Sequence, residues 1–318
     1  MLASRPQFRA VHAMRTMLCK KLVLGCPFLL GLALVGSPTA RAQDAGDPSA
    51  EAKAASFTNL QAVTITGNGQ DAMEPFLTRD GKVLFFNNSN APTVDTNLFW
   101  ATKVDDLSFQ LRGEIGGVNG PALDAVASMD LGNNFYFVST RSYDTTLSTI
   151  YSGNYSKGSV SGPAIVAGVS PTRRGFVDFD QEISADGNTL YFTEGLFTGG
   201  SVPASSELLI ARRSDNGFMR DPQSKEMLRT INSTGRLNYA ACTSADELEI
   251  FFTRLNGKEP AILMASRTST AKPFGAAEKI VTSTGFVEAP TISPDGRSLY
   301  FHRRNPDGVF SIYRVTRP

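Results

Sequence analysis

The chain is poor in the residues that build metal clusters, disulfide frameworks and catalytic triads. Its 318 residues include three cysteines and two histidines, and beyond residue 42 only Cys242 and His302 remain. One imidazole cannot supply the several histidines of most zinc sites, and one cysteine forms no disulfide within the chain. The sequence also lacks a G-x-S-x-G turn and a glycine-rich loop that joins a strand to a helix. Serine hydrolases of the elbow type and nucleotide-binding proteins are therefore excluded, and we expect no organic cofactor.

Apolar runs long enough to span a membrane are missing as well. The run from Leu22 to Val35 is interrupted by glycine and proline, whereas a span needs about 20 apolar residues. Basic residues precede this run, and Ala40-Arg41-Ala42 follows it with the spacing of a cleavage site. We interpret residues 1–42 as a signal peptide, with Met14 as an alternative start. A periplasmic or secreted protein without a membrane span after cleavage is the expected product.

Positive charge is scarce once this segment is removed. The segment carries six of the 31 Lys and Arg residues and none of the 30 Asp and Glu residues, which leaves a formal charge of −5. Non-specific nucleic-acid binding depends on basic patches, so no nucleic-acid partner is expected. Residues 43–56 are small and polar without apolar periodicity. We interpret them as a flexible leader, and residues 57–318 as one folded domain.

What the chain does contain is a repeated hairpin pattern. The stretch ISPDGRSLYF, residues 292–301, combines a strand pattern, an Asp-Gly turn and a second strand rich in β-formers. Related stretches recur at steps of 50, 56, 60 and 49 residues, each with two adjacent aromatics after the aspartate. The turn aspartates of the five copies are Asp80, Asp130, Asp186, Asp246 and Asp295. Repeats of this length predict a β-propeller or a solenoid.

Each repeat offers four strand-like pieces, which is typical of a propeller blade. The fourth piece of the third repeat is assigned to residues 224–232. The last repeat ends after its third piece, whereas residues 60–66, which precede the first repeat, resemble a fourth piece. We therefore predict an all-β fold: a five-bladed β-propeller of four-stranded blades, closed by an N-terminal strand that joins the last blade.

The last copy carries a resemblance to a known repeat. Its Ser293-Pro294-Asp295-Gly296 core, followed by Leu299-Tyr300-Phe301, resembles the Pro-Asp type of WD40-like β-propeller repeat found in TolB-like proteins. The resemblance covers residues 57–318, although the other copies depart from the core, for example with Ala185 in place of the proline. It implies a propeller fold and export to the periplasm, and it does not carry over the partner of TolB.

Acidic residues recur just before or within the first strands of the repeats. In a propeller these strands line the central channel, so their side chains would surround one channel mouth. The candidate ligand-binding residues are Glu74, Asp124, Asp180, Glu182, Tyr239 and Glu288. Such oxygen ligands suit a hard cation such as calcium, an amine or a sugar. The alternative is that the carboxylates accept hydrogen bonds from backbone N–H groups at strand ends.

Three hypotheses for the function fit these features. The favoured hypothesis is a binding or scaffold protein without catalytic residues, whose ligand or partner surface is the channel mouth and its loops. An envelope protein or a carbohydrate would be the partner. The alternative is a carbohydrate-active hydrolase or lyase that uses two mouth carboxylates about 5–10 Å apart across a sugar. A purely structural ring within a larger complex is a third hypothesis.

Other polar residues are expected to serve the fold. The second strands end in polar residues, and His302 is interpreted as one of them, aligned with Asn87, Thr193 and Thr253. Arginines also follow the second strands and are predicted to form ion pairs between blades, for instance with the turn aspartates. These arginines are Arg141, Arg254, Arg303 and Arg304. Cys242 lies in a first strand, where we expect a buried hydrophobic residue.

Overall fold

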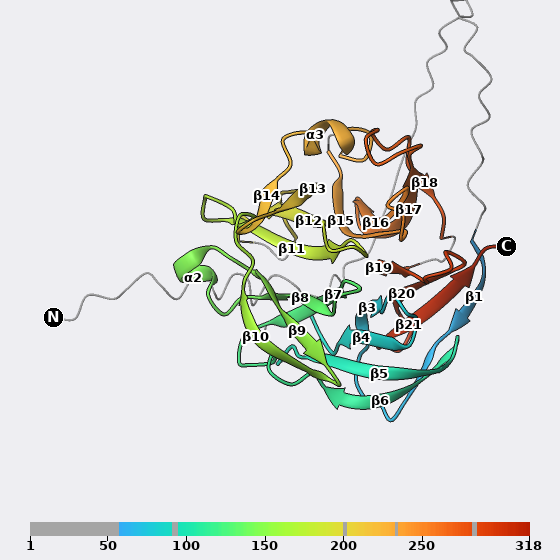
Figure 1. The fold of residues 1–318 in the computed structure, drawn as a ribbon. Helices are drawn as coiled ribbons and strands as arrows, with labels where there is room; N and C mark the ends of the chain where they lie inside the picture. The colour runs from blue at the N-terminus through green and yellow to red at the C-terminus, as the bar shows by residue number, and fades with distance from the viewer. Residues whose placement is uncertain (1–56, 91–94, 200–201, 233–234, 282–284) are drawn as a thin grey trace, which may run out of the picture.

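The computed structural model describes residues 57–90, 95–199, 202–232, 235–281 and 285–318. Within them the chain forms five β-sheets that radiate from a common centre as the blades of a propeller (Figure 1). The predicted fold class is confirmed. The predicted signal peptide, residues 1–42, and leader, residues 43–56, lie outside the described residues. Among the described residues, no helix has the length and apolar character needed to cross a membrane.

Each blade begins with a strand at the centre of the ring and ends with a strand at its rim. In this order, the first blade contains β3 (Met73–Leu77), β4 (Val83–Asn87), β5 (Leu98–Asp105), β6 (Ser108–Glu114) and β2 (Thr64–Thr66). The second contains β7 (Asp124–Met129), β8 (Asn134–Ser139), β9 (Ile150–Ser156) and β10 (Ser159–Ile165). The third contains β11 (Phe176–Ile183), β12 (Thr189–Leu196), β13 (Ser205–Ser214) and β14 (Gly217–Arg220). The fourth contains β15 (Leu237–Thr243), β16 (Glu249–Asn256), β17 (Glu259–Ser266) and β18 (Glu278–Lys279). The fifth contains β19 (Val287–Ile292), β20 (Ser298–Arg304), β21 (Phe310–Thr316) and β1 (Thr58–Ala62).

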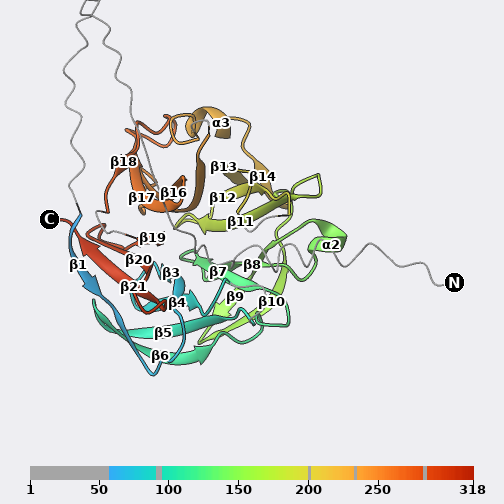
Figure 2. The same ribbon diagram turned by 180° about the vertical axis from the view of Figure 1, so that it is seen from behind.

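The first strands of the five blades surround the central channel. Each contacts the next around the ring, from β3 through β7, β11 and β15 to β19, and β19 contacts β3 again. Figure 2, seen from behind, shows the same radial arrangement. Residues that begin the first strands therefore meet at one end of the channel, which we call the channel mouth.

The aromatic pairs of the repeats form the core between blades. Adjacent residues of a strand point to opposite faces of a sheet, and each blade packs against a neighbour on both faces. Both members of each pair are consequently buried, with exposed fractions of at most 3%. The pairs are Phe85 and Phe86, Tyr136 and Phe137, Tyr191 and Phe192, Phe251 and Phe252, and Tyr300 and Phe301.

The hairpin turns use a hydroxyl and an aspartate together. In four blades the turn aspartate accepts a hydrogen bond from a hydroxyl two residues earlier, and that hydroxyl accepts the N–H five residues after itself. These aspartates are Asp80, Asp186, Asp246 and Asp295. The second blade differs, because Asp130 itself accepts the Asn134 N–H at 2.9 Å in place of the hydroxyl. Asp130 thus occupies the position that the hydroxyl residue has in the other blades, two residues before the position of their turn aspartates. The N–H that it accepts lies four residues later instead of five, so this turn is one residue shorter.

The N-terminal residues divide between two blades. Strand β1 pairs antiparallel with β21 as the outer strand of the fifth blade, with Thr58 opposite Thr316. Strand β2 instead pairs in parallel with β6 of the first blade. Of the predicted residues 60–66, only the first part therefore lies in the last blade. That this strand closes the ring stays a prediction.

The fourth strand of the third blade was placed wrongly by the sequence. It comprises Gly217–Arg220, whereas the predicted range 224–232 begins with helix α3 (Ser224–Met227). A second short helix, α2 (Tyr143–Thr146), lies between β8 and β9. Lysine, glutamate and methionine are good helix formers and weak strand formers, which explains the local preference at α3.

Candidate functional site at the channel mouth

Every first strand contains a β-bulge at the same depth in the channel. The register with the second strand shifts there in all five blades. One residue of each bulge adopts the left-handed conformation, with φ between 49° and 54°, although none is glycine. These residues are Glu74, Val126, Asp180, Ala240 and Ala289. Such conformations are sparsely populated because the Cβ atom crowds the backbone, so the surrounding contacts must stabilise them.

Polar side chains of the preceding blade bind the backbone N–H groups of these bulges. Asn87 Oδ1 accepts the Val126 N–H at 3.2 Å, and Thr253 Oγ1 accepts the Ala289 N–H at 3.0 Å. The imidazole of His302 plays this role for the first blade, since its Nδ1 accepts the Glu74 N–H at 3.1 Å. Polar residues at the ends of second strands therefore join three of the blades to the next one, whereas the Ala240 N–H of the fourth blade is bound by the Asp180 carboxylate.

Four of the six candidate residues gather at the channel mouth with His302. The Tyr239 hydroxyl donates to Glu288 Oε1, and His302 Nε2 lies 3.4 Å from Glu288 Oε2. Asp180 Oδ2 accepts the Ala240 N–H at 3.1 Å, and Glu74 shares a group of ligand-type atoms within 4.8 Å with Glu288 and His302. Three carboxylates from three different blades thus lie near one another. We call Glu74, Asp180, Tyr239, Glu288 and His302 the mouth cluster.

Burial and mutual repulsion shift the acidities of the mouth cluster. Burial raises the pKa of Glu74, His302 opposes this rise, and the charge of Glu288 adds to it. Burial raises the pKa of Asp180 well above its ordinary value, and the charges of Glu74 and Glu288 raise it further. Burial and then Glu288 raise the pKa of the Tyr239 phenol. Burial lowers the pKa of His302, but the hydrogen bond with Glu288 and the charge of Glu74 outweigh it and raise the pKa overall.

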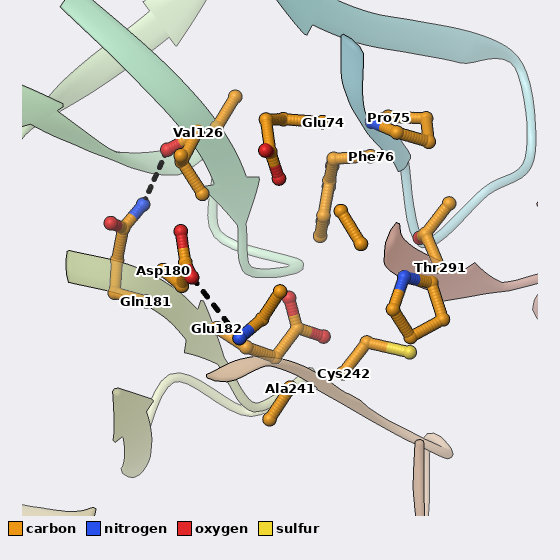
Figure 3. A pocket seen from close by; sticks show the side chains of 14 residues that line it. Glu74, Pro75, Phe76, Val126, Asp180, Gln181, Glu182, Ala241, Cys242 and Thr291 are labelled. Atoms are coloured by element: carbon orange, nitrogen blue, oxygen red, sulfur yellow. Dashed lines mark hydrogen bonds between the residues drawn. The ribbon is translucent and has the colours of Figure 1, made fainter. Parts of the chain in front are cut away.

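A small cavity lies between the bulges on the channel axis. Figure 3 shows the Glu74 and Asp180 side chains reaching into the same space from β3 and β11. The cavity measures about 30 Å³, which is room for about two water molecules. Its other walls are mostly apolar, with Pro75, Ala127 and Pro290 among them. Glu74 and Asp180 are each 8% exposed, so both residues are buried with only a small contact with solvent.

The other two candidate residues do not join the mouth cluster. Asp124 is fully buried and lies 2.7 Å from Arg141 of its own blade. Glu182 is buried two residues further along β11, where it lines the same cavity but lies 2.7 Å from Arg79. Burial raises the pKa of both carboxyls despite the arginines. An arginine therefore balances the charge of each, which favours a structural role.

Two residues of the site were not recognised in the sequence as site residues. His302 was assigned only to a strand end, but it also faces Glu288. Asn90, whose Nδ2 donates to Glu74 Oε1 at 2.8 Å, lies in the loop after β4 and shows no repeated pattern. The Asn90–Glu74 contact lies within the first blade and the His302–Glu288 contact within the fifth, whereas the contact of His302 with the Glu74 N–H joins two blades that are distant in sequence. The repeat pattern indicates none of these side-chain contacts.

The prediction for the four arginines was wrong. Arg141 pairs with Asp124 inside its blade, and Arg254 donates to Asn238 Oδ1 and to the Ile231 carbonyl. Arg303 and Arg304 lie over the rings of Tyr313 and Phe310. Within the described residues, none of the four forms an ion pair with a turn aspartate. The turns lie at the opposite ends of the second strands, beyond the reach of these side chains. Cys242 is buried as expected, and its pKa is raised by that burial.

Comparison with known proteins gives the fold but no family. No protein-family model and no curated protein sequence matches the chain. Among solved structures, a glycoside hydrolase aligns with a TM-score of 0.56 at 11% identity, over 82% of this chain and 92% of that one. The catalytic domain of the GH62 α-L-arabinofuranosidase from Coprinopsis cinerea aligns with a TM-score of 0.51 at 11% identity, over 83% and 96%.

A TolB structure also aligns, with a weaker overlap. TolB from Acinetobacter baumannii gives a TM-score of 0.44 at 16% identity, over 78% of this chain and 54% of that one. This TM-score is too low to support any comparison of function. Identities this low establish the propeller fold, which hosts unrelated functions, and leave the function to the chemistry of the site.

Proposed function

We propose that this protein is an exported, periplasmic or secreted propeller of the WD40-like type that binds a ligand or partner at its channel mouth. The observation that carries the proposal is a difference in charge balance. Asp124 and Glu182 are each paired with an arginine, whereas Glu74, Asp180 and Glu288 have no lysine or arginine within 4.0 Å among the described residues. Unbalanced buried carboxylates are unfavourable for the free protein, and sites that bind ligands commonly contain such groups.

A binding screen tests this proposal. Thermal shifts of the protein would be measured with amines, divalent cations, oligosaccharides and lysine-containing peptides. A ligand at 100 times its Kd should add about 2.7 kcal/mol to the free energy of unfolding. We expect the double variant Glu74→Gln, Asp180→Asn to lose this shift, while the exposed control Glu259→Gln keeps it. Binding that survives in the double variant would refute the channel mouth as the binding surface.

A carbohydrate-active hydrolase or lyase is the second candidate. The raised pKa of Asp180 beside Glu74 favours it, because a glycosidase needs one protonated carboxyl beside an ionised one. The small axial cavity argues against it, since a sugar ring would have to remain above the bulges. Release of reducing ends from a panel of polysaccharides would decide the question. Turnover that Asp180→Asn abolishes would support the enzyme, and no turnover would remove this candidate.

A further inference from the structure

We infer that the channel mouth binds a primary ammonium group, which Glu74 and Asp180 hold between their carboxylates. This inference rests on the proposed function, because it specifies the chemistry of the ligand that the same surface takes. The residues come from β3 and β11, which lie on different sides of the axial cavity (Figure 3). The ammonium group would enter from the mouth, where both residues keep a small exposed fraction although the Glu74 Oε2 atom itself is buried.

The first argument is an unsatisfied acceptor. Glu74 is more than nine-tenths buried, and Asn90 donates only to its Oε1 atom. The other oxygen, Oε2, is buried and has no hydrogen-bond partner among the described residues. An ionised carboxylate without a partner is strongly disfavoured away from water. A donor with positive charge would satisfy this atom and offset the repulsion between Glu74 and Asp180.

The size of the cavity selects the kind of cation. About 30 Å³ accommodates about two water molecules, and an ammonium group is similar in size to one. Its three N–H donors suit two carboxylates and a remaining water. A guanidinium is a rigid plane with five donors, and it needs more room. A quaternary ammonium has no N–H donor for the Glu74 Oε2 atom and is recognised by several aromatic faces, whereas Phe76 is the single aromatic residue among those that line this cavity.

Metal ions fit the mouth cluster less well. Calcium takes six to eight oxygen ligands, but one oxygen of Glu74 and one of Asp180 are already used by Asn90 and Ala240. A transition metal would need a deprotonated nitrogen of His302. Because Nδ1 of this ring accepts the Glu74 N–H, the neutral ring carries its hydrogen on Nε2, the atom that faces Glu288. His302 therefore positions Glu74 and Glu288 and does not offer a free metal ligand.

Two sources can deliver such a group. One is a small linear amine, and the other is a lysine side chain of a peptide segment that lies across the mouth. Both present a primary ammonium on a flexible alkyl chain, so the chemistry of the site is shared. Butylammonium tests the chemistry, whereas spermidine and an acetylated, amidated Gly-Lys-Gly peptide distinguish the two sources.

Calorimetric titration with matched probes tests the inference. Butylammonium should bind, whereas butyltrimethylammonium, with the same charge and chain but a larger head without donors, should bind at least tenfold more weakly. Glu74→Gln and Asp180→Asn should each weaken butylammonium binding at least tenfold, and the exposed control Glu259→Gln should leave it unchanged. Circular dichroism and the melting temperature of each free variant would confirm that it is folded.

Each outcome has a definite meaning. Equal binding of the two probes, or unchanged binding by Glu74→Gln, would overturn the inference. If no amine binds, but a neutral sugar or a divalent ion binds in the screen and the double variant loses that binding, the ammonium inference is overturned. The proposed function then remains intact. A ligand that no mouth variant affects would refute both. Tighter binding of spermidine than of the lysine peptide would identify a small amine, and the reverse would identify a peptide.

Discussion

At the scale of single residues, the carboxylates of the channel differ in whether a cation balances their charge. Glu74→Gln removes a charge that burial and Glu288 disfavour, so it should raise the free energy of unfolding by about 1 kcal/mol. Glu182→Gln should instead lower it by about 3 kcal/mol, because Arg79 loses its buried partner. Urea unfolding of both variants measures the difference. A loss of stability in Glu74→Gln would show that the carboxylate is a structural group.

The pH dependence of stability should reveal a buried carboxyl outside the mouth. Burial raises the pKa of Asp178 from 3.8 to about 8, although Arg220 opposes the rise, and Glu194 adds to it. Between these two values, the folded state holds a proton that the unfolded state has released. Stability should therefore fall as pH rises from about 5 to 8, by up to roughly 1.4 kcal/mol per pH unit for one proton.

The variant Asp178→Asn isolates this contribution. Its unfolding free energy should depend less steeply on pH over the same interval, with Arg220 still able to donate to the amide oxygen. Urea titrations across this interval, compared with the wild type, provide the measurement. An identical slope in the variant and the wild type would mean that Asp178 stays ionised beside Arg220, 2.9 Å away.

The roles of single carboxylates were harder to predict from the sequence than the strands that carry them. The sequence predicted that Glu74, Asp180, Tyr239 and Glu288 share a mouth, because their positions repeat in the first strands. It did not separate them from Asp124 and Glu182, which differ from the others because each has an arginine partner. The arginines that neutralise those two residues come from a turn and from a strand end, and no spacing rule connects them.

At the scale of strands and turns, close backbone approaches set which positions require glycine. A Cβ atom on Gly168, which has a φ of +88°, would lie 1.6 Å from the Phe218 carbonyl oxygen of β14. Gly257 has a φ of +74° but open space around it. In both alanine variants the left-handed backbone conformation should lower the free energy of unfolding by about 1 kcal/mol. Gly168→Ala should lower the free energy of unfolding by at least about 2 kcal/mol more than Gly257→Ala does, because β14 must move to make room for the added Cβ atom.

Thermal or urea unfolding of the two alanine variants measures this difference. Gly257→Ala serves as the control for conformational strain alone. Equal losses would mean that the third blade adjusts to the added methyl group without breaking its outer pairing, and that the tight approach of residue 168 to β14 does not hold this edge.

The repeat pattern predicted strands better than it predicted their exceptions. The hairpins of the last blade agree with the structure within two residues, because the Asp-Gly turn and the aromatic pair are both local features. The second-blade turn and helix α3 were misread. In the former a carboxylate replaces a hydroxyl, so the alignment on aspartate was displaced. In the latter a helix-forming segment occupies the place where other repeats have a strand.

At the scale of the whole molecule, the N-terminal end of the described chain packs against the last two blades. Phe57, which is 3% exposed, packs edge-on against Phe251 at 5.9 Å and under the guanidinium of Arg317. Phe57→Ala should lower the free energy of unfolding by about 3–5 kcal/mol. Leu60→Ala, in the adjacent strand β1 but 42% exposed, should change it by less than about 0.5 kcal/mol. A small effect of Phe57→Ala would argue that the ring is stable without its N-terminal strand.

The pairing of β1 with β21 also has a consequence for the order in which the chain is made. Each of the first four blades takes its strands from one neighbourhood of the sequence, so each can form while later residues are still being synthesised. The fifth blade cannot form in this way, because its outer strand β1 is synthesised before all other strands and the partner of β1, residues 310–316, is synthesised last. A product that stops before residue 310 keeps β1 unpaired and leaves an open gap in the circle. Unpaired edges invite association with other chains, so we expect such fragments to aggregate or be degraded instead of accumulating as partial rings.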